Sequence, residues 1–249
     1  MHEVIDFGGD GRGILLLHGL MGRATTWWPV TRWLTGYGRV VGMDARAHGR
    51  NPLTEGRTED FAADAAKVIS AEGLGPAVVI GHSMGGLHAI AVAAAYPELV
   101  RAIVVEDMAP DFRGRTADKW RKYFETWPVP FQSLAHVRQF FGTNGDYFIE
   151  CFEERADGYH LIASLEQLYP IAGEWGEREY WSMVERVRCP MLAIQGEHGT
   201  TPAGQMSEMP LRAPGGGKHL VVPDAGHVVH RDQPEHYRGA VEAFLSALT

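Results

Sequence analysis

The clearest chemical signature in this sequence is Gly81-His82-Ser83-Met84-Gly85, a G-x-S-x-G pattern. An apolar run, residues 77–80, precedes it, and small and apolar residues with helical spacing, 87–95, follow it. In this setting the pattern is typical of a nucleophile elbow, a sharp strand-to-helix turn that exposes a serine above a sheet. Glycines two residues before and after the serine avoid the Cβ clashes of a tight turn. We therefore predict that Ser83 is a catalytic nucleophile.

A serine nucleophile needs a nearby base, because a free hydroxyl is a poor nucleophile. Among 12 histidines, His227 is the best placed, since it follows the last predicted strand and comes after the serine in the chain. His230 is the alternative base. The two could resemble a metal-binding pair, but no third ligand is evident, so no metal is predicted. Three other histidines are expected to pack or lie exposed: His82, His198 and His219.

Acyl transfer also needs donors for the negative charge that develops on the carbonyl oxygen. One donor is expected to be the backbone N–H of Met84, which directly follows the serine. The second should come from the loop after the buried strand 13–17, and we assign it to the N–H of Leu20. Because both donors are backbone groups, their side chains are nearly free to vary.

Strands and helices alternate along most of the chain and must position these groups. The run 13–17 is apolar throughout, as expected for a parallel strand covered on both faces. The pattern predicts an α/β fold with a mostly parallel, doubly wound sheet and helices on both faces. The predicted strands are 4–7, 13–17, 39–43, 77–80, 99–105, 191–195 and 219–222, and the predicted helices are 25–34, 60–71, 87–95 and 235–248.

The residues with possible chemistry fall at the ends of these predicted strands. Ligands of such sheets bind at the carboxyl ends of the strands, where side chains from different strands meet. This convergence favours one shared site over scattered polar turns. The residues that follow strands in this way are His18, Asp44, Ser83, Glu106, Asp107, Glu197 and His227.

The alternation stops between residues 108 and 186. This segment contains 16 of the chain's 25 aromatic residues, more than a small helical unit can bury alone. We predict a mainly helical cap inserted into a core formed by residues 1–107 and 187–249. Most of its aromatic rings should pack on one another, while some should form an apolar pocket above Ser83.

Composition narrows the function classes. The 249-residue chain carries a net charge of −8, which argues against nucleic acid or an anionic membrane as a partner. No apolar stretch approaches the roughly 18 residues of a membrane span, and no signal peptide is evident. The two cysteines, far apart in sequence, suit a reducing cytoplasm. We expect a cytoplasmic monomer or homodimer that acts on a small molecule.

Taken together, the motifs resemble those of the α/β-hydrolase superfamily. The matching residues, in chain order, are His18-Gly19, the segment Asp44-x-Arg46-x-His48-Gly49, the Ser83 turn and Gly226-His227. The resemblance covers both core segments, whereas the cap matches only in position and helical character. It implies an α/β-hydrolase fold, a Ser–His–acid triad, a lid over the pocket and no cofactor.

The triad acid is where the sequence departs from this family. Many members place an Asp three residues after the glycine that ends the penultimate strand, but Gly199 stands at that position here. Some relatives place the acid one strand earlier, directly before the cap, as in the Asp-x-Ala-Pro stretch of small bacterial esterases. We therefore predict Asp107 as the acid, with Glu106 and Glu197 as the alternatives.

The resulting hypothesis is a serine hydrolase that cleaves a carboxylic ester or thioester of an apolar or aromatic small molecule. A serine at the elbow argues against haloalkane dehalogenases and epoxide hydrolases, whose relatives use Asp there. Carbon–carbon bond hydrolysis and cofactor-free haloperoxidase activity use the same triad and stay as alternatives. A ligand-binding receptor with vestigial catalysis is a further alternative, because the usual position of the triad acid holds no acid here.

Overall fold

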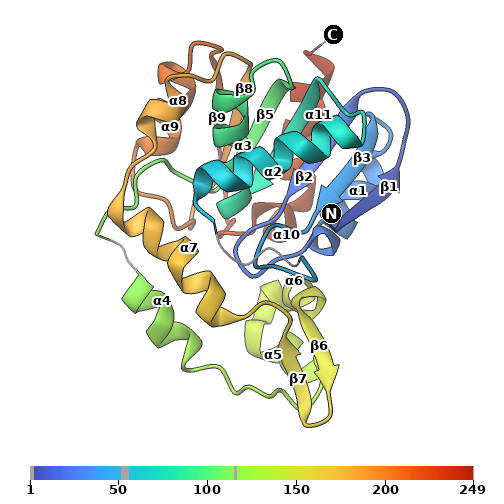
Figure 1. Ribbon diagram of the computed structural model, residues 1–249, viewed down its shortest axis with the longest axis vertical. Helices are drawn as coiled ribbons and strands as arrows, with labels where there is room; N and C mark the ends of the chain where they lie inside the picture. The colour runs from blue at the N-terminus through green and yellow to red at the C-terminus, as the bar shows by residue number, and fades with distance from the viewer. Residues whose placement is uncertain (1–2, 52–55, 115–116, 249) are drawn as a thin grey trace.

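A seven-stranded sheet forms the centre of the computed structural model, which describes residues 3–51, 56–114 and 117–248 (Figure 1). The strand order is β1-β3-β2-β4-β5-β8-β9, and only the edge strand β1 runs antiparallel to its neighbour. The strands are β1 (Val4–Gly8), β2 (Gly13–Leu17), β3 (Arg39–Met43), β4 (Ala77–His82), β5 (Val100–Glu106), β8 (Met191–Gly196) and β9 (Gly217–Val222). The predicted α/β fold with a mostly parallel sheet is confirmed.

Helices cover both faces of this sheet, as the sequence predicts. In Figure 1, α2 and α3 cross in front of the strands. The core helices are η1 (Ala24–Trp27), α1 (Trp28–Leu34), α2 (Thr58–Ala71), α3 (Met84–Ala95), α9 (Gln205–Arg212), α10 (Val229–Asp232) and α11 (Pro234–Ser246). Of these, the short helices α9 and α10 were not predicted. None of the helices in the described ranges is long and apolar enough to cross a membrane.

Alternate residues of the central strands feed two separate apolar clusters. In β2, Leu15 and Leu17 pack with residues of α2 and α3, whereas Ile14 and Leu16 pack with residues of α1 and α11. Successive side chains of a strand point to opposite faces, so a strand covered on both faces must be apolar throughout. This is why the run 13–17 contains no polar residue.

The chain leaves the sheet between β5 and β8. The elements of this segment are α4 (Ala117–Phe124), α5 (Leu134–Phe141), η2 (Gly142–Asn144), α6 (Gly145–Phe148), η3 (Ile149–Cys151), β6 (Phe152–Arg155), β7 (Gly158–Leu161), α7 (Leu165–Glu177) and α8 (Trp181–Val184). Most of the segment, from α4 to α7, lies below the sheet in Figure 1, whereas α8 lies beside α9. Many of its aromatic rings contact one another, with Trp127 within 6.5 Å of five neighbouring phenylalanine rings. The division into core and cap at residues 108 and 186 stays a prediction.

The cap is helical, but it also contains an antiparallel hairpin that was not predicted. Strands β6 and β7 pair from Phe152 opposite Leu161 to Arg155 opposite Gly158. The two-residue loop between them is Ala156-Asp157, and Gly158, with φ 138°, begins β7. The sequence does not predict this hairpin because its strands are only four residues each and lack a clear alternating pattern.

Candidate active site

The turn at Ser83 has the strained geometry that a nucleophile elbow requires. Ser83 connects β4 directly to α3 and has φ 51° and ψ −123°, a conformation that non-glycine residues rarely adopt. The turn is so tight that a Cβ on Gly81 would lie 2.1 Å from the backbone oxygen of Gly85. The glycines of the motif are therefore required by close backbone approach. Ser83 is held further by its N–H, which donates to the carbonyl of Glu106.

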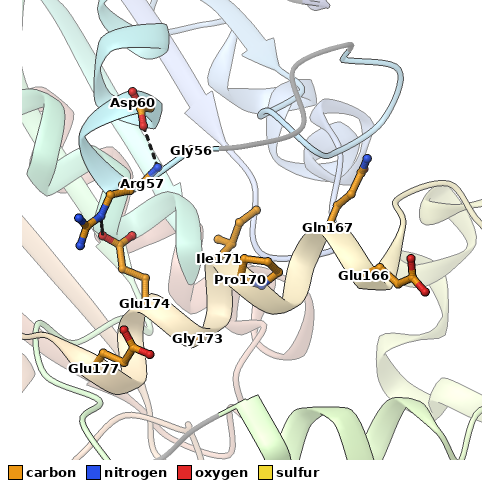
Figure 2. Close-up of a pocket in the computed structure, with 10 residues that line it drawn as sticks. All are labelled: Gly56, Arg57, Asp60, Glu166, Gln167, Pro170, Ile171, Gly173, Glu174 and Glu177. Atoms are coloured by element: carbon orange, nitrogen blue, oxygen red, sulfur yellow. Dashed lines mark hydrogen bonds and ion pairs between the residues drawn. The ribbon is translucent and has the colours of Figure 1, made fainter.

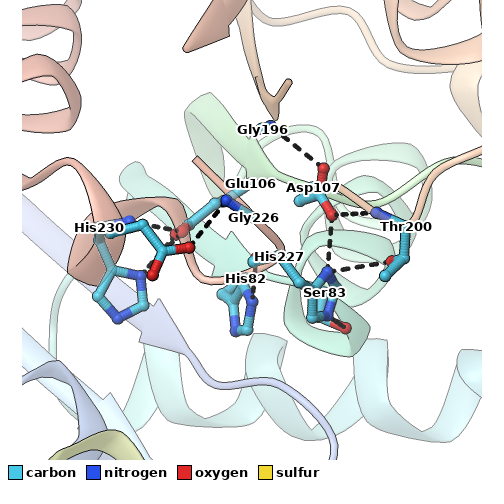
Figure 3. Close-up of polar contacts among 10 residues, drawn as sticks. His82, Ser83, Glu106, Asp107, Gly196, Thr200, Gly226, His227 and His230 are labelled. Atoms are coloured by element: carbon cyan, nitrogen blue, oxygen red, sulfur yellow. Dashed lines mark hydrogen bonds and ion pairs between the residues drawn. The ribbon is translucent and has the colours of Figure 1, made fainter. Parts of the chain in front are cut away.

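Three of the predicted residues form a continuous series of hydrogen bonds (Figure 3). Ser83 Oγ lies 2.9 Å from His227 Nε2, and His227 Nδ1 lies 2.7 Å from Asp107 Oδ2. A carboxylate only accepts, so Nδ1 carries the ring hydrogen and Nε2 is free to accept the serine proton. Asp107 is fully buried, whereas the His227 side chain is 27% exposed. This is the arrangement that makes a serine nucleophilic.

Asp107 is fixed by groups from the neighbouring strand. It follows β5 with φ 43°, and its N–H donates to the carbonyl of Ile194. The Asp107 carboxylate accepts from the N–H of Gly196 at 3.3 Å and from the N–H of Thr200 at 3.0 Å. Two backbone donors satisfy the buried charge and hold it toward His227.

The two alternative acids lie elsewhere. Glu106 accepts hydrogen bonds from His230, at 2.9 Å from both its N–H and its Nδ1. Burial alone would raise the pKa of Glu106, but His230 and His82 nearby lower that pKa overall. Glu197 is on the surface and accepts from the N–H of Asp224. His230, the alternative base, is therefore a partner of Glu106.

His82, expected to pack beside the turn, also contacts His227. Its Nε2 donates to the carbonyl of His227 at 2.9 Å, and the two rings lie 4.8 Å apart. Burial lowers the pKa of His82 to about 3, so the ring is uncharged near neutral pH. No local pattern predicts this contact, because 145 positions separate the two residues. As expected, His198 is exposed. His219 Nε2 lies 3.0 Å from Gln195 Oε1.

The loop that carries Leu20 lies against the nucleophile turn. A Cβ on Gly19 would lie 3.3 Å from the Cβ of Ser83, and one on Gly85 would lie 2.2 Å from the carbonyl oxygen of Leu17. Met84 is the first residue of α3, where N–H groups have no intrahelical acceptor. Within the described ranges, neither the Leu20 nor the Met84 N–H donates to another group. Their role as oxyanion donors stays a prediction.

A small cavity opens beside Ser83, between the core and α7. Its volume is about 30 Å³. Two of its lining residues, Phe112 and Trp175, are aromatic residues of the predicted cap. The sequence predicts that some aromatic rings of the cap form an apolar pocket above Ser83. The lining residues are Ser83, Met108, Phe112, Ala172, Trp175, Thr200 and His227.

A much larger cavity, of about 1040 Å³, lies between the start of α2 and the other side of α7 (Figure 2). It is lined by Gly56, Arg57, Asp60, Glu166, Gln167, Pro170, Ile171, Gly173, Glu174 and Glu177, none of which belongs to the Ser83 site. Arg57 and Glu174 in its wall form an ion pair at 3.3 Å. The chemistry therefore points to the smaller cavity, despite the difference in size.

One group of side chains in the described ranges has the composition of a metal site. Ligand atoms of Glu197, His198 and Asp224 lie within 4.8 Å of one another, and all three residues are exposed. Exposed carboxylates commonly cluster without binding an ion, and nothing further points to a metal here. His227 and His230 do not face a common point as a metal pair would, since their Nδ1 atoms contact Asp107 and Glu106 respectively.

Comparison with known proteins gives one family match that covers most of the chain. The model of a family described as "Alpha/beta hydrolase family" matches residues 14–237. A crystal structure of E-2-(acetamidomethylene)succinate hydrolase superposes with a TM-score of 0.88 at 22% sequence identity. That superposition covers 98% of this chain and 95% of the other. At this level of identity, the superposition shows a shared fold.

Two curated relatives also match over nearly the whole chain. An sn-1-specific diacylglycerol lipase of Danio rerio is 35% identical, over 98% of this chain and 81% of its own. The 2-(acetamidomethylene)succinate hydrolase of Mesorhizobium japonicum is 25% identical, over 96% of this chain and 90% of its own. Both names describe hydrolases, and their substrates differ widely.

Proposed function

This chain belongs to the alpha/beta hydrolase family, and from that premise we propose that it is a serine hydrolase. Its substrate is a carboxylic ester or thioester of an apolar or aromatic small molecule. The observation that carries the proposal is the hydrogen-bonded series from Asp107 through His227 to Ser83, with separations of 2.7 Å and 2.9 Å.

In the first half of the proposed reaction, Ser83 Oγ attacks the acyl carbon. His227 Nε2 removes the hydroxyl proton, and Asp107 stabilises the imidazolium that forms. The N–H groups of Leu20 and Met84 donate to the carbonyl oxygen as it becomes negative. His227 then protonates the leaving alcohol or thiol, the bond to it breaks, and the acyl group stays on Ser83.

The second half repeats these steps with water as the nucleophile. His227 removes a proton from water, whose oxygen attacks the acyl carbon of the ester on Ser83. The tetrahedral intermediate collapses, and His227 returns the proton to Ser83 Oγ. The products are a carboxylic acid and a restored enzyme.

The cavity beside Ser83 supports an uncharged and compact acyl group. Four of its lining side chains are apolar, namely Met108, Phe112, Ala172 and Trp175. Its described lining includes no lysine, arginine or carboxylate, so a dicarboxylate such as the succinate in one relative's name would find no charged partner there. A volume of about 30 Å³ holds only a small group unless the cap moves.

Hydrolysis of p-nitrophenyl esters tests the proposal. The wild-type protein should hydrolyse acetyl and butyryl esters faster than octanoyl esters. Ser83→Ala should reduce kcat/KM at least about 10³-fold, because the acyl-enzyme cannot form. Its circular dichroism spectrum should match that of the wild type.

Full activity in Ser83→Ala would contradict the proposed mechanism. A wild-type protein that hydrolyses no ester or thioester would favour another function on this fold. The remaining functions to test would then be carbon–carbon bond hydrolysis, haloperoxidase activity and ligand binding without turnover.

A further inference from the structure

Thr200 contacts both the histidine and the acid of the proposed triad (Figure 3). Its Oγ1 lies 3.1 Å from His227 Nδ1, and its N–H donates to Asp107 Oδ2 at 3.0 Å. Thr200 also lines the cavity beside Ser83. No feature of the sequence had singled it out.

The direction of these bonds follows from the chemistry of the atoms. Asp107 Oδ2 accepts from His227 Nδ1, so the ring hydrogen sits on Nδ1. The Thr200 hydroxyl oxygen must then accept from that same hydrogen, as the weaker branch of a shared bond. The imidazole N–H therefore has two acceptors, one charged and one neutral.

Thr200 reaches this place because the turn after β8 wraps around the Asp107 carboxylate. The N–H groups of Gly196 and Thr200 both donate to that carboxylate, from opposite ends of the turn. At the middle of the turn, a Cβ on Gly199 would lie 2.1 Å from Asp107 Oδ1. Because residue 199 has no side chain, the Asp107 carboxylate and the Thr200 hydroxyl can both contact His227 Nδ1.

We propose that Thr200 is a positioning residue whose hydroxyl helps to hold the His227 ring and stabilises its protonated form. This inference rests on the proposed function, since it assigns a role within the same hydrolytic site. A hydroxyl acceptor binds an imidazolium more strongly than a neutral imidazole. Removing it should therefore disfavour the charged ring both in the transition state and in the free enzyme at low pH.

The groups around His227 allow this effect to be isolated in a pH profile. Asp107 faces Nδ1, and His82 faces the ring from β4 at 4.8 Å. The pKa of His82 is lowered to about 3 by burial, so it does not change charge between pH 5 and 8. Glu106 and His230 lie beyond His82, bonded to each other. A substitution at Thr200 leaves all of these in place.

The test compares Thr200→Val, Thr200→Ser and Thr201→Val in the full-length protein. Thr200→Val keeps the shape and the N–H bond to Asp107 but removes the hydroxyl, and Thr200→Ser keeps the hydroxyl. Thr201→Val is the matched control, because the buried Thr201 hydroxyl has no partner within the described residues. The measurement is kcat/KM for a p-nitrophenyl ester from pH 5 to 9.

Thr200→Val should lower kcat/KM about threefold to tenfold on the plateau. The acid limb of the profile should also move to lower pH by about half a unit. Thr200→Ser and Thr201→Val should follow the wild type.

An unchanged Thr200→Val profile would overturn the inference, as would an equal loss in Thr200→Ser with no movement of the limb. If thermal unfolding shows that Thr200→Val does not fold, Thr200→Ala replaces it under the same criteria. The Ser83→Ala result is independent of these outcomes. An active wild type with an inactive Ser83→Ala keeps the proposed function even if Thr200 has no role.

Discussion

Asp107 and Gly199 compete for one position in the site. A Cβ on Gly199 would lie 2.1 Å from Asp107 Oδ1 and 2.8 Å from Oδ2, so a side chain there would overlap the carboxylate. The carboxylate that lies against His227 thus fills the space into which a residue at 199 would project. A side chain at position 199 and the Asp107 carboxylate therefore exclude each other, which explains why position 199 is a glycine in this chain.

Asp107→Asn should lower kcat/KM by about 10³- to 10⁴-fold, as loss of the acid does in enzymes with an established Ser–His–Asp triad. The amide cannot stabilise the imidazolium and favours the wrong ring tautomer. Asn tolerates a positive φ such as the 43° at this position, so the fold should survive. Ester hydrolysis measures the effect, with Glu197→Gln as the control that keeps full activity. Loss of activity in Glu197→Gln instead would show that the triad acid is Glu197, after β8, and not Asp107.

The shared position also predicts that the acid can be moved. Asp107→Gly should be nearly inactive, and glycine suits the positive φ there. Adding Gly199→Asp should recover activity at least about tenfold, since the new carboxylate enters the emptied space near His227 Nδ1. Gly199→Asp alone should be inactive or unstable, because two carboxylates would overlap. A double variant no more active than Asp107→Gly would show that position 199 cannot supply the acid.

One carboxylate, that of Glu174, joins α7 to the start of α2. Glu174 accepts from the N–H and the hydroxyl of Thr58, both at 3.0 Å, and pairs with Arg57 and Arg178. Arg178 in turn pairs with Glu59 on α2. The N–H groups in the first turn of a helix lack intrahelical acceptors, so Glu174 also caps α2. Figure 2 shows the Arg57–Glu174 ion pair in the wall of the larger cavity.

Glu174→Ala should destabilise the protein by about 1–3 kcal/mol, because it leaves the buried Thr58 without its charged acceptor. The Arg57 and Arg178 side chains are partly exposed, so their ion pairs should add little. Urea unfolding measures the change, with Glu177→Ala, at an exposed position on the same helix, as the control. Equal stability of the two variants would show that Glu174 does not secure α7 to the core.

For the molecule as a whole, four of the buried histidines in the described ranges have a lowered pKa. Burial lowers the pKa of His18 to about 4 and that of His48 to about 3. It likewise lowers the pKa of His82 to about 3 and that of His88 well below its usual value. These rings are uncharged in the folded protein and take up protons near pH 6.5 once unfolded. The unfolded state is therefore favoured progressively as the pH falls below about 6.5.

Stability should fall steeply between about pH 6.5 and pH 4, by up to about 1.4 kcal/mol per pH unit for each buried histidine. His88→Gln should reduce this slope by one such contribution. His88 is suited to the test because it stacks on Phe61 at 4.1 Å rather than on a residue of the proposed triad. Urea unfolding at several pH values gives the slope, and His198→Gln, on the surface, should leave it unchanged. An unaltered slope in His88→Gln would mean that His88 is protonated in the folded state.

Local sequence patterns were enough to predict the strands of the main sheet, the turn at Ser83 and the histidine beside it. Apolar runs predicted the seven strands of the main sheet because each side chain of a doubly covered strand meets a core, as in 13–17. The glycines around Ser83 predicted the elbow, and the clash that a Cβ on Gly81 would make is with Gly85, only four positions away. His227 was predicted from its place after the last strand, and it lies 2.9 Å from Ser83 Oγ.

Only the tertiary structure decided which carboxylate meets His227. Glu106 and Asp107 are adjacent in sequence, and the backbone bend at φ 43° after β5 sends one toward His230 and the other toward His227. Thr200 joins residues 93 and 27 positions away, a distance across which no local pattern acts. Sequence periodicity reports which side chains are buried. The contacts between strand ends depend on how the sheet is assembled, because residues distant in the chain meet only there.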